Sequence, residues 1–349
     1  MSQQLILFQL SSSIVLKKNT SIEIGHDVKV TEKSTQQGRV YYGLLGIVRL
    51  VNTHVFLIKE QVKIGQIRNC SIYKVLGIEV VNCTKQDLTN IQYEQEKYCL
   101  EGIKLALQNI YYSNEYDLTM PLRYNTKYIS TLNQGTSSDI VNNDFWFNFH
   151  MQLQLNSYPE FQIRAISGFV ELKPIAGKSQ NAVVQGFYGI ISRKLNKRGG
   201  TRYHSRGIDS DGNVSNCVET EQFCLLDKDW QSHIQLRGSI PLFWRHVVTG
   251  AYTPLLQIHD AASVETKDAY LKHLKWLEAQ YGQQTFVNLV NQKGSELLLA
   301  QGFAKQLIHS PQVHYVAFDF HKECSNLRWH RLSLLLDQIK SDIDANSYI

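Results

Sequence analysis

The sequence predicts a mixed α/β protein, in which a β-rich N-terminal part is followed by a part with a partly parallel sheet. Residues 40–81 consist of apolar runs rich in Val, Ile, Tyr and Leu, separated by short polar breaks, as in antiparallel strands. From residue 267 onward, strand and helix patterns alternate, which is the order of a parallel sheet with crossover helices. The 349 residues are 43% hydrophobic and 19% charged, a globular composition sufficient for two domains.

The N-terminal elements follow from these apolar patterns. Three β-rich runs, Y-Y-G-L-L-G-I-V-R-L, V-F-L-I and S-I-Y-K-V-L-G-I-E-V-V, predict the antiparallel strands. A helix is predicted over residues 87–108, because apolar side chains recur there at near-helical spacing. A second β-rich stretch covers residues 161–224. We place the domain junction near residues 146–151, which gives domains 1–150 and 151–349.

The C-terminal elements alternate between the two periodicities. We expect a helix over 267–281 that ends at Gly282, a strand over 285–290, a helix over 295–309, a strand over 313–320 and a helix over 326–342. Ligands of such sheets bind beyond the carboxyl ends of the strands, where the polar loops 291–295 and 319–323 are expected. Ser295 is predicted to cap the helix that it opens, which leaves backbone N–H groups for an anion.

Composition excludes several classes of site. The six cysteines, at positions 70, 83, 99, 217, 224 and 324, contain no C-x-x-C pair, so neither a disulfide framework nor a zinc site is predicted. His321-Lys322-Glu323 matches the H-x-E of zinc deaminases, but the P-C-x-x-C partner is missing. No metal or cofactor is therefore predicted. No apolar run approaches the ~20 residues of a membrane span, and no signal peptide is expected, which implies a cytosolic face.

Basic residues gather in one short segment, although the net charge of +5 is mild. Residues 193–206 contain six cations and no acidic residue: Arg193, Lys194, Lys197, Arg198, Arg202 and Arg206. Guanidinium groups suit phosphate, so an anionic partner is predicted here. The alternative is a solvated hairpin with weak surface ion pairs to Glu219 or Glu221. No basic-aromatic repeat favours nucleic acid.

Two other stretches carry polar side chains of interest. Asp319, His321 and Glu323 alternate at a strand end, where they could serve as acid, base or orienting groups. An equally weighted alternative is that the Asp319 carboxylate only accepts hydrogen bonds from the loop backbone, and that His321 has a purely structural role. Arg237 begins the turn R-G-S-I-P, and Trp244, which follows it, is interpreted as a core residue.

These motifs together resemble the Sac family of phosphoinositide phosphatases over most of the chain. The weaker matches are L-L-G-I-V-R-L at 44–50, S-I-Y-K-V at 71–75, F-W-F-N at 145–148 and G-F-V-E-L-K-P at 168–174. The stronger matches are R-Y at 202–203, R-G-I-D at 206–209, V-E-T-E-Q at 218–222, R-G-S-I-P at 237–241 with Trp244, residues 288–296 and F-D-F-H-K-E-C at 318–324. R-G-I-D combined with F-D-F-H-K-E-C is most similar to the endoplasmic reticulum and Golgi branch.

The resemblance implies that a phosphate is removed from the inositol ring of a membrane phosphoinositide, without a metal. In the family, a cysteine thiolate in a C-x5-R-T loop attacks phosphorus, and water hydrolyses the phosphocysteine. The implied substrate-binding candidates are Arg202, Arg206, Arg237, Lys293, Asp319, His321 and Glu323. The implied partners are phosphoinositide headgroups and proteins that contact the N-terminal subdomain, at the cytosolic face of endoplasmic reticulum or Golgi membranes.

The C-x5-R-T loop itself is missing from these 349 residues. The residues six positions after the cysteines are Leu76, Thr89, Leu105, Phe223, Trp230 and His330. In the family the loop lies some tens of residues beyond F-D-F-H, so we expect an incomplete catalytic domain that is inactive alone. Either the chain is a fragment of a phosphatase, or it is a short non-catalytic scaffold that binds phosphoinositides or proteins. A third possibility is an unstable chain, whose helix 326–342 exposes an apolar face of Trp329, Leu332, Leu336 and Ile339.

Overall fold

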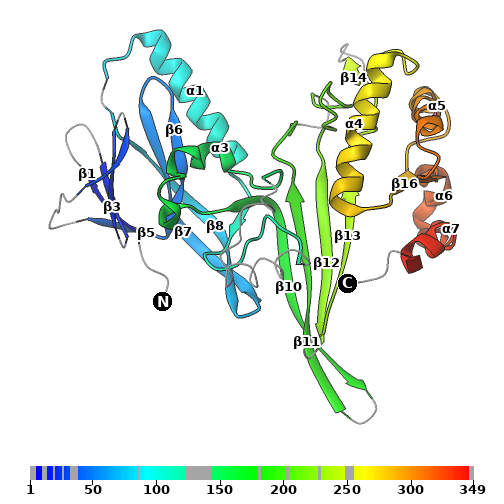
Figure 1. The fold of residues 1–349 in the computed structure, drawn as a ribbon, viewed down its shortest axis with the longest axis horizontal. Coiled ribbons are helices and arrows are strands. Elements are labelled where there is room, and N and C mark those ends of the chain that lie inside the picture. Colours follow the sequence, from blue (N-terminus) through cyan, green and yellow to red (C-terminus); the bar gives the residue numbers. More distant parts are fainter. Residues whose placement is uncertain are drawn as a thin grey trace. The chain divides into compact units, whose positions relative to one another are not determined.

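The computed structural model (Figure 1) describes residues 5–9, 14–18, 20–25, 27–31, 38–84, 86–122, 143–179, 182–200, 204–226, 229–247 and 255–345. The chain forms two compact units. The N-terminal unit comprises Met1–Asn196 and Thr220–Ile234, and the C-terminal unit comprises Lys197–Glu219 and Gln235–Ile349. The division at residue 150 into an N-terminal Sac subdomain and a catalytic domain stays a prediction.

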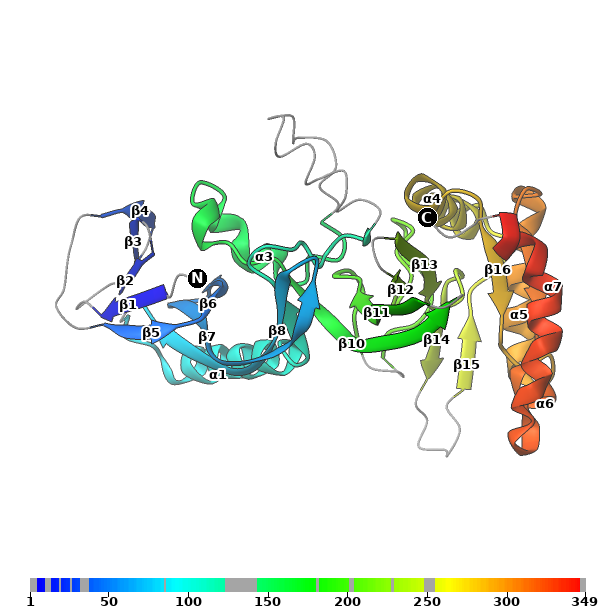
Figure 2. The same ribbon diagram turned by 90° about the horizontal axis from the view of Figure 1, so that it is seen from below.

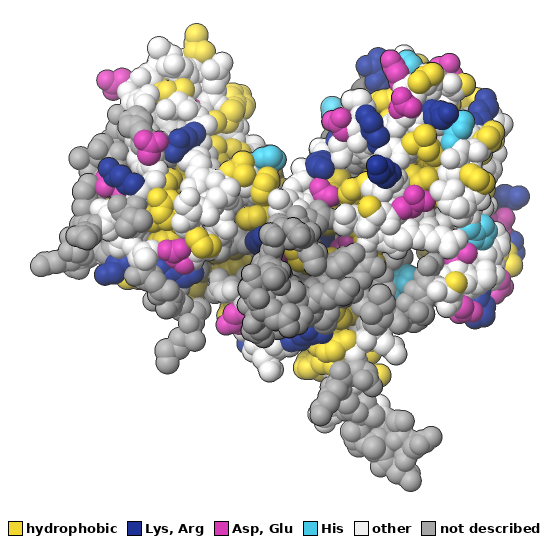
Figure 3. All heavy atoms as spheres, viewed as in Figure 1, with side chains coloured by type: hydrophobic (Ala, Val, Ile, Leu, Met, Phe, Trp, Pro, Cys, Tyr) yellow, Lys and Arg dark blue, Asp and Glu magenta, His cyan; other side chains and the backbone are white. Residues whose placement is uncertain are grey.

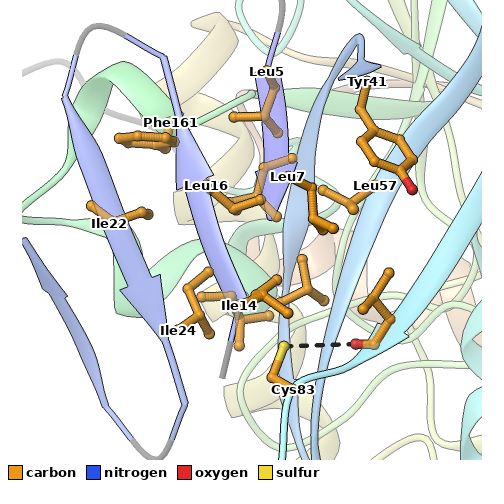
Figure 4. Close-up of a cluster of buried hydrophobic side chains, with 14 of the residues drawn as sticks. Leu5, Leu7, Ile14, Leu16, Ile22, Ile24, Tyr41, Leu57, Cys83 and Phe161 are labelled. Carbon is orange, nitrogen blue, oxygen red and sulfur yellow. Dashed lines mark hydrogen bonds between the residues drawn. The ribbon is translucent and has the colours of Figure 1, made fainter. Parts of the chain in front are cut away.

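The first sheet of the N-terminal unit is antiparallel, with the strand order β4-β3-β2-β1-β5. Its strands are β1 (Leu5–Gln9), β2 (Ile14–Lys17), β3 (Ser21–Ile24), β4 (Val28–Val30) and β5 (Arg39–Tyr41). Alternating apolar side chains of these strands converge on Leu57 and Phe161 from other segments of the unit (Figure 4). This buried cluster provides one core of the unit.

The second sheet has the order β13-β12-β11-β10-β9-β8-β7-β6. Its strands are β6 (Gly43–Arg49), β7 (Thr53–Ile67), β8 (Cys70–Asn82), β9 (Ile110–Tyr112), β10 (Ala165–Ser179), β11 (Ala182–Lys194), β12 (Val218–Leu226) and β13 (Asp229–Arg237). The antiparallel strands predicted within residues 40–81 are confirmed as β6, β7 and β8. At the β7–β8 turn, Arg68 and Asn69 have φ of 48° and 66°, the conformation of a type I′ hairpin.

The F-W-F-N motif and the helix after it form hydrogen bonds to an irregular part of β6. The pairing of β6 with β7 shifts register between Leu44 and Gly46, which leaves carbonyl groups without strand partners. Asn148 Nδ2 donates to Leu45 O at 2.7 Å, and α3 (Phe149–Gln152) carries Gln152, whose amide also donates to Leu45 O at 2.8 Å. A Cβ at Gly46 would lie 2.3 Å from Met151 Cβ, so only glycine fits this approach.

Helix α1 (Asn90–Ala106) lies within the predicted range 87–108. Thr89 caps its N-terminus in a capping box with Gln92. Figure 2 shows α1 running along β7 and β8, and its partly buried Leu100 and Ile103 pack against the cluster that contains Phe56. Short 3-10 turns, η1 (Leu153–Leu155) and η2 (Pro159–Phe161), lead to β10.

The C-terminal unit contains a parallel strand pair, β16 (Thr285–Asn288) and β17 (His314–Ala317), which confirms the predicted partly parallel sheet. The remaining elements are the antiparallel pair β14 (Trp244–Val247) and β15 (Leu255–Ile258), helices α4 (Val264–Tyr281), α5 (Ser295–Gln306), α6 (Phe320–Glu323) and α7 (Leu332–Ala345), and the 3-10 turns η3 (Leu307–His309), η4 (Ser325–Leu327) and η5 (Trp329–Arg331). Leu242, Tyr270 and Phe303 belong to its buried core.

Three details of this unit differ from the sequence predictions. The last helix begins at Leu332 instead of residue 326, because Asn326 and Leu327 adopt left-handed φ of 55° and 60° and break the helix. Strand β17 ends at Ala317, and residues 320–323 form the short helix α6. Ser295 does not cap α5, since Gly294 occupies the N-cap with φ of 65° and no side chain bonds there.

The apolar face predicted on the last helix is partly exposed. Trp329 and Leu336 are 53% and 55% exposed, whereas Leu332 and Ile339 are partly buried. The structure places no fully buried residue in α7. The helix therefore packs on the unit mainly through partly buried side chains. Polar interactions add to this packing, such as the hydrogen bond between His314 Nδ1 and Asp342 Oδ2 at 2.6 Å.

Candidate functional site

Two polar loops meet at the carboxyl ends of β16 and β17, as the sequence predicts. The strand pair extends beyond its last register position, because Phe318 N donates to Asn288 O at 2.9 Å. Gln292 N, in the loop after β16, then donates to Asp319 Oδ2 at 3.0 Å. This bond joins loops 291–295 and 319–323 into one surface of the C-terminal unit.

The Asp319 carboxylate holds the two loops of this surface together through hydrogen bonds. It is 9% exposed, and its other carboxylate oxygen caps α6 by accepting from Lys322 N at 3.0 Å. The backbone bonds from Lys322 and Gln292 lower the pKa of Asp319 below its ordinary value. Positive charge on Lys293 and His321 acts in the same direction, and together these effects outweigh burial. Asp319 is thus held ionised as a structural anchor.

Basic side chains of the two joined loops remain open to solvent. Lys293, His321 and Lys322 are all exposed. The loop backbone beside them is fixed, because Asn291 N donates to Glu296 Oε2 at 2.9 Å, and Gly294 then opens α5. Cations near the N-terminus of a helix provide an environment that favours an anionic group.

Glu323 has a different partner from the other members of its motif. Arg331 Nε donates to Glu323 Oε2 at 2.8 Å, and the two side chains are 36% and 20% exposed. The structure thus directs Glu323 toward η5. Its role as a substrate-binding residue stays a prediction.

The remaining described candidates, Arg206 and Arg237, lie on a second set of connected loops. Gly207 N donates to Ser239 Oγ at 2.8 Å, which ties the residue after Arg206 to the turn that follows Arg237. Arg206 lies 5.5 Å from the ring centroid of Trp244, a cation–π distance. Arg237 is exposed at the end of β13, and Arg202 lies outside the described residues.

Trp244 supports this second group from the core. Its indole Nε1 donates to Ile240 O at 3.1 Å, and its ring packs against the buried cluster that contains Leu242. The interpretation of Trp244 as a core residue agrees with this packing.

The basic segment 193–206 differs from the sequence prediction, because its first arginine is buried. Arg193 is 0% exposed, donates to Glu221 Oε2 at 2.7 Å and also donates to Leu118 O and Met120 O. It is therefore not available to an external anion. The surface ion pairs of the alternative interpretation are also contradicted, because Glu219 and Glu221 are 1% and 0% exposed.

The alternation of side chains along β11 and β12 could have predicted this burial. On β12, Glu219 and Glu221 share a face with the core residue Phe223, and on β11 Arg193 shares one with Ile191. A charged residue on the same strand face as core residues indicates that it is buried against a partner of opposite charge. Glu221 also accepts from Leu122 N and Ser232 Oγ, and Glu219 accepts from Tyr281 OH at 2.6 Å.

Among the described residues, no three His, Cys, Asp or Glu side chains gather in a way that could hold a metal ion. Within the same part of the chain, none of the helices has the length and apolar character needed to cross a membrane.

Comparison with known proteins identifies the family. The chain is 33% identical over 318 residues to phosphatidylinositol-3-phosphatase SAC1-B of Danio rerio, covering 88% of this chain and 53% of the relative. It is 35% identical to SAC1-A of the same fish, covering 85% and 51%, and 32% identical to phosphatidylinositol-3-phosphatase SAC1 of Saccharomyces cerevisiae, covering 85% and 48%. The chain spans about half the length of these curated relatives. Residues 42–325 match the SacI homology domain, and the chain therefore belongs to the Sac family.

Proposed function

We propose that this chain forms the substrate-recognition part of a Sac-type phosphatase, which removes phosphate from the inositol ring of phosphatidylinositol phosphates through a cysteine nucleophile. The observation that supports this most is the joined pair of loops at the carboxyl ends of β16 and β17. There Asp319 fixes two backbone segments, while Lys293 and His321 remain exposed beside it. The relatives that carry the same domain are named phosphatidylinositol-3-phosphatases.

Each candidate residue has a distinct role in this proposal. Lys293, Arg206 and Arg237, with Arg202, supply positive charge to the phosphate oxygens of the headgroup, and His321 donates a ring N–H to them. Asp319 positions the two loops and does not contact phosphate, because a second anion there would repel it. Glu323 acts indirectly by holding Arg331 near the same helix.

The nucleophile is not supplied by these 349 residues, none of whose cysteines has an arginine six positions later. Cys324, next to the loop motif, is only 6% exposed, so its sulfur is not accessible to a substrate. We therefore expect the polypeptide by itself to be inactive. The expected test is phosphate release from vesicles that contain phosphatidylinositol monophosphates, with the zebrafish relative as the positive control. Turnover clearly above the protein-free background would refute this expectation.

Headgroup recognition is tested separately by vesicle co-sedimentation. Arg237→Glu with Lys293→Glu is expected to weaken binding to phosphatidylinositol monophosphate vesicles about tenfold or more, since each change reverses one cation. The control, Lys275→Glu with Lys305→Glu, makes the same charge change at exposed positions of α4 and α5. Equal binding by both double variants would remove the proposed headgroup site.

The second candidate function is a non-catalytic scaffold that binds phosphoinositides or proteins. It is favoured by the missing C-x5-R pattern. A fusion of this chain to the remaining half of the zebrafish relative distinguishes the two. Hydrolysis by the fusion supports the phosphatase, whereas lipid binding without hydrolysis supports the scaffold. For either function we propose the cytosolic face of endoplasmic reticulum or Golgi membranes as the location.

A further inference from the structure

Basic and acidic side chains are mixed on the face of the C-terminal unit shown in Figure 3, over α4 and α5. Such a surface gives an anionic headgroup little overall direction, because its charges offset one another. Recognition then depends on the orientation of single cations. A guanidinium presents its paired N–H groups to phosphate only when its plane is held. The groups that hold Arg206 in place therefore matter for the proposed function.

The guanidinium of Arg198 is directed at the loop that contains Arg206. Its Nε and Nη2 donate to Ser215 Oγ at 3.1 and 3.0 Å, and Nη2 also donates to Arg206 O at 3.0 Å. Nη1 lies 3.9 Å from Asp209 Oδ2. Ser215 is 0% exposed, so the hydroxyl that accepts two of these bonds is shielded from water. Arg198 thus binds the loop instead of presenting its guanidinium to an external anion.

The backbone of Arg198 belongs to the same network. Its carbonyl accepts from Ser205 Oγ and from Asn216 N, both at 3.2 Å. Asn216 Nδ2 in turn donates to Ser205 O at 3.2 Å. Arg198 and Asn216 have φ of 47° and 53°, a left-handed conformation that few non-glycine residues adopt. Such backbone persists where the surrounding bonds define it, and it clusters at functional sites.

Arg206 is held at both its backbone and its side chain. Its carbonyl accepts from Arg198, and its guanidinium lies 5.5 Å from the ring centroid of Trp244. The next residue, Gly207, has φ of 70°, and a Cβ there would lie 2.5 Å from Leu242 O. The loop therefore packs closely on the turn before Trp244, and Arg198 fixes it from the other side of the peptide backbone.

We propose that Arg198 is a positioning residue of the headgroup site, which orients Arg206 and does not itself contact phosphate. This inference rests on the proposed function, in which Arg206 binds the headgroup. A lysine at position 198 would place its charge at one point and could not bond Ser215, Arg206 and Asp209 together. Because Arg198 acts through Arg206, the effects of removing the two side chains are not additive.

The test is a double-mutant cycle, measured by co-sedimentation of the full chain with phosphatidylcholine vesicles that contain a phosphatidylinositol monophosphate. Arg198→Met and Arg206→Met are each expected to weaken binding about fivefold or more. Arg198→Met/Arg206→Met is expected to bind no more than about twofold more weakly than Arg206→Met alone. Arg198→Lys is expected to weaken binding as much as Arg198→Met, although it retains the charge.

Two further variants control for charge and for folding. Arg245→Met removes an exposed arginine of β14, whose Nε donates to Gln257 Oε1 at 2.9 Å, and is expected to bind normally. Ser215→Ala removes the shared acceptor without changing any charge and is expected to weaken binding in the same direction as Arg198→Met. The urea unfolding midpoint of each variant separates a loss of binding from a loss of folding. If Arg198→Met does not fold, Ser215→Ala takes its place in the cycle.

Normal binding by Arg198→Met, or by Ser215→Ala where it takes that place, would overturn the positioning role. Additive losses in the double variant, or recovery of binding by Arg198→Lys, would also overturn it and assign Arg198 a direct effect of its charge. In these cases the headgroup site stands, provided that Arg206→Met weakens binding. Unchanged binding by Arg206→Met would instead refute the part of Arg206 in the proposed function, and the positioning role with it.

Discussion

Charged side chains are placed differently in the two compact units. In the N-terminal unit, Arg193 and Glu221 are both 0% exposed and bind each other and the neighbouring backbone. In the C-terminal unit, Lys293, His321 and Arg237 are exposed at strand ends. The comparison shows that a cluster of arginines in a sequence does not by itself mark an anion site. What matters is whether the strand register directs each side chain inward or outward.

Buried polar groups in the N-terminal unit should consequently affect stability most, and exposed charges in the C-terminal unit should affect it least. The four predictions that follow test this difference, beginning with the largest effect.

Arg193→Met should destabilise the protein by about 3–5 kcal/mol, because it leaves the Glu221 carboxylate buried without its cation. The measurement is the urea unfolding midpoint. Arg193→Met/Glu221→Gln is the matched variant, which should recover part of the loss by removing both charges. A single-variant loss below about 1 kcal/mol would contradict the view that this pair is fully desolvated.

Asn148→Ala should cost about 3 kcal/mol, since each unsatisfied buried polar group costs about 1–3 kcal/mol. The side chain donates to Leu45 O and Ile163 O and accepts from Trp146 Nε1 and Ala165 N. Thermal unfolding followed by circular dichroism measures the effect. Asn156→Ala, at a more exposed position, serves as the control and should change stability little. Equal losses in the two variants would show that Asn148 does not fasten β6.

His273 should make the C-terminal unit sensitive to acid. Burial lowers the pKa of His273 from 6.5 to about 4, although its hydrogen bond with Gly212 O acts in the opposite direction. Because the unfolded chain then binds the proton more tightly, stability is retained above pH 6.5 and decreases as the pH falls toward 4. The expected loss is about 2–3 kcal/mol. Urea unfolding at several pH values should show a smaller decrease for His273→Gln, and identical pH profiles would refute the assignment.

Arg331→Ala should have the smallest effect, below about 1 kcal/mol, because its pair with Glu323 is partly exposed and screened. Urea unfolding in low and high salt measures it, and salt should reduce the wild-type advantage. A loss as large as that of Arg193→Met would remove the distinction between the two units.

Much of the fold could be predicted because local periodicity determines it. The helix that ends at Gly282 and the strands β6 to β8 were both predicted from sequence. The start of α7 was not, because left-handed backbone at Asn326 and Leu327 gives no strong sequence signal in non-glycine residues. For Ser295 the local capping preference was overridden by the turn at Gly294.

The candidate site was predictable in its location but not in its internal bonds. Parallel strands bring their carboxyl ends together, so loops 291–295 and 319–323 were expected to be neighbours. That Asp319 accepts from Gln292, and that Glu323 instead accepts from Arg331, depends on the exact path of each loop. Such paths are set by packing and not by residue type.

The sequence by itself determined the family, the mixed α/β class and the absence of a C-x5-R pattern in these residues, because motifs and periodicity are local properties of the chain. The tertiary structure alone decided which charges are buried. Arg193 and Lys293 are both cations in the sequence, but only a specific strand register places Glu221 against Arg193, far from it in the chain. Burial of a charge requires a partner in space, and that partner is supplied by the fold.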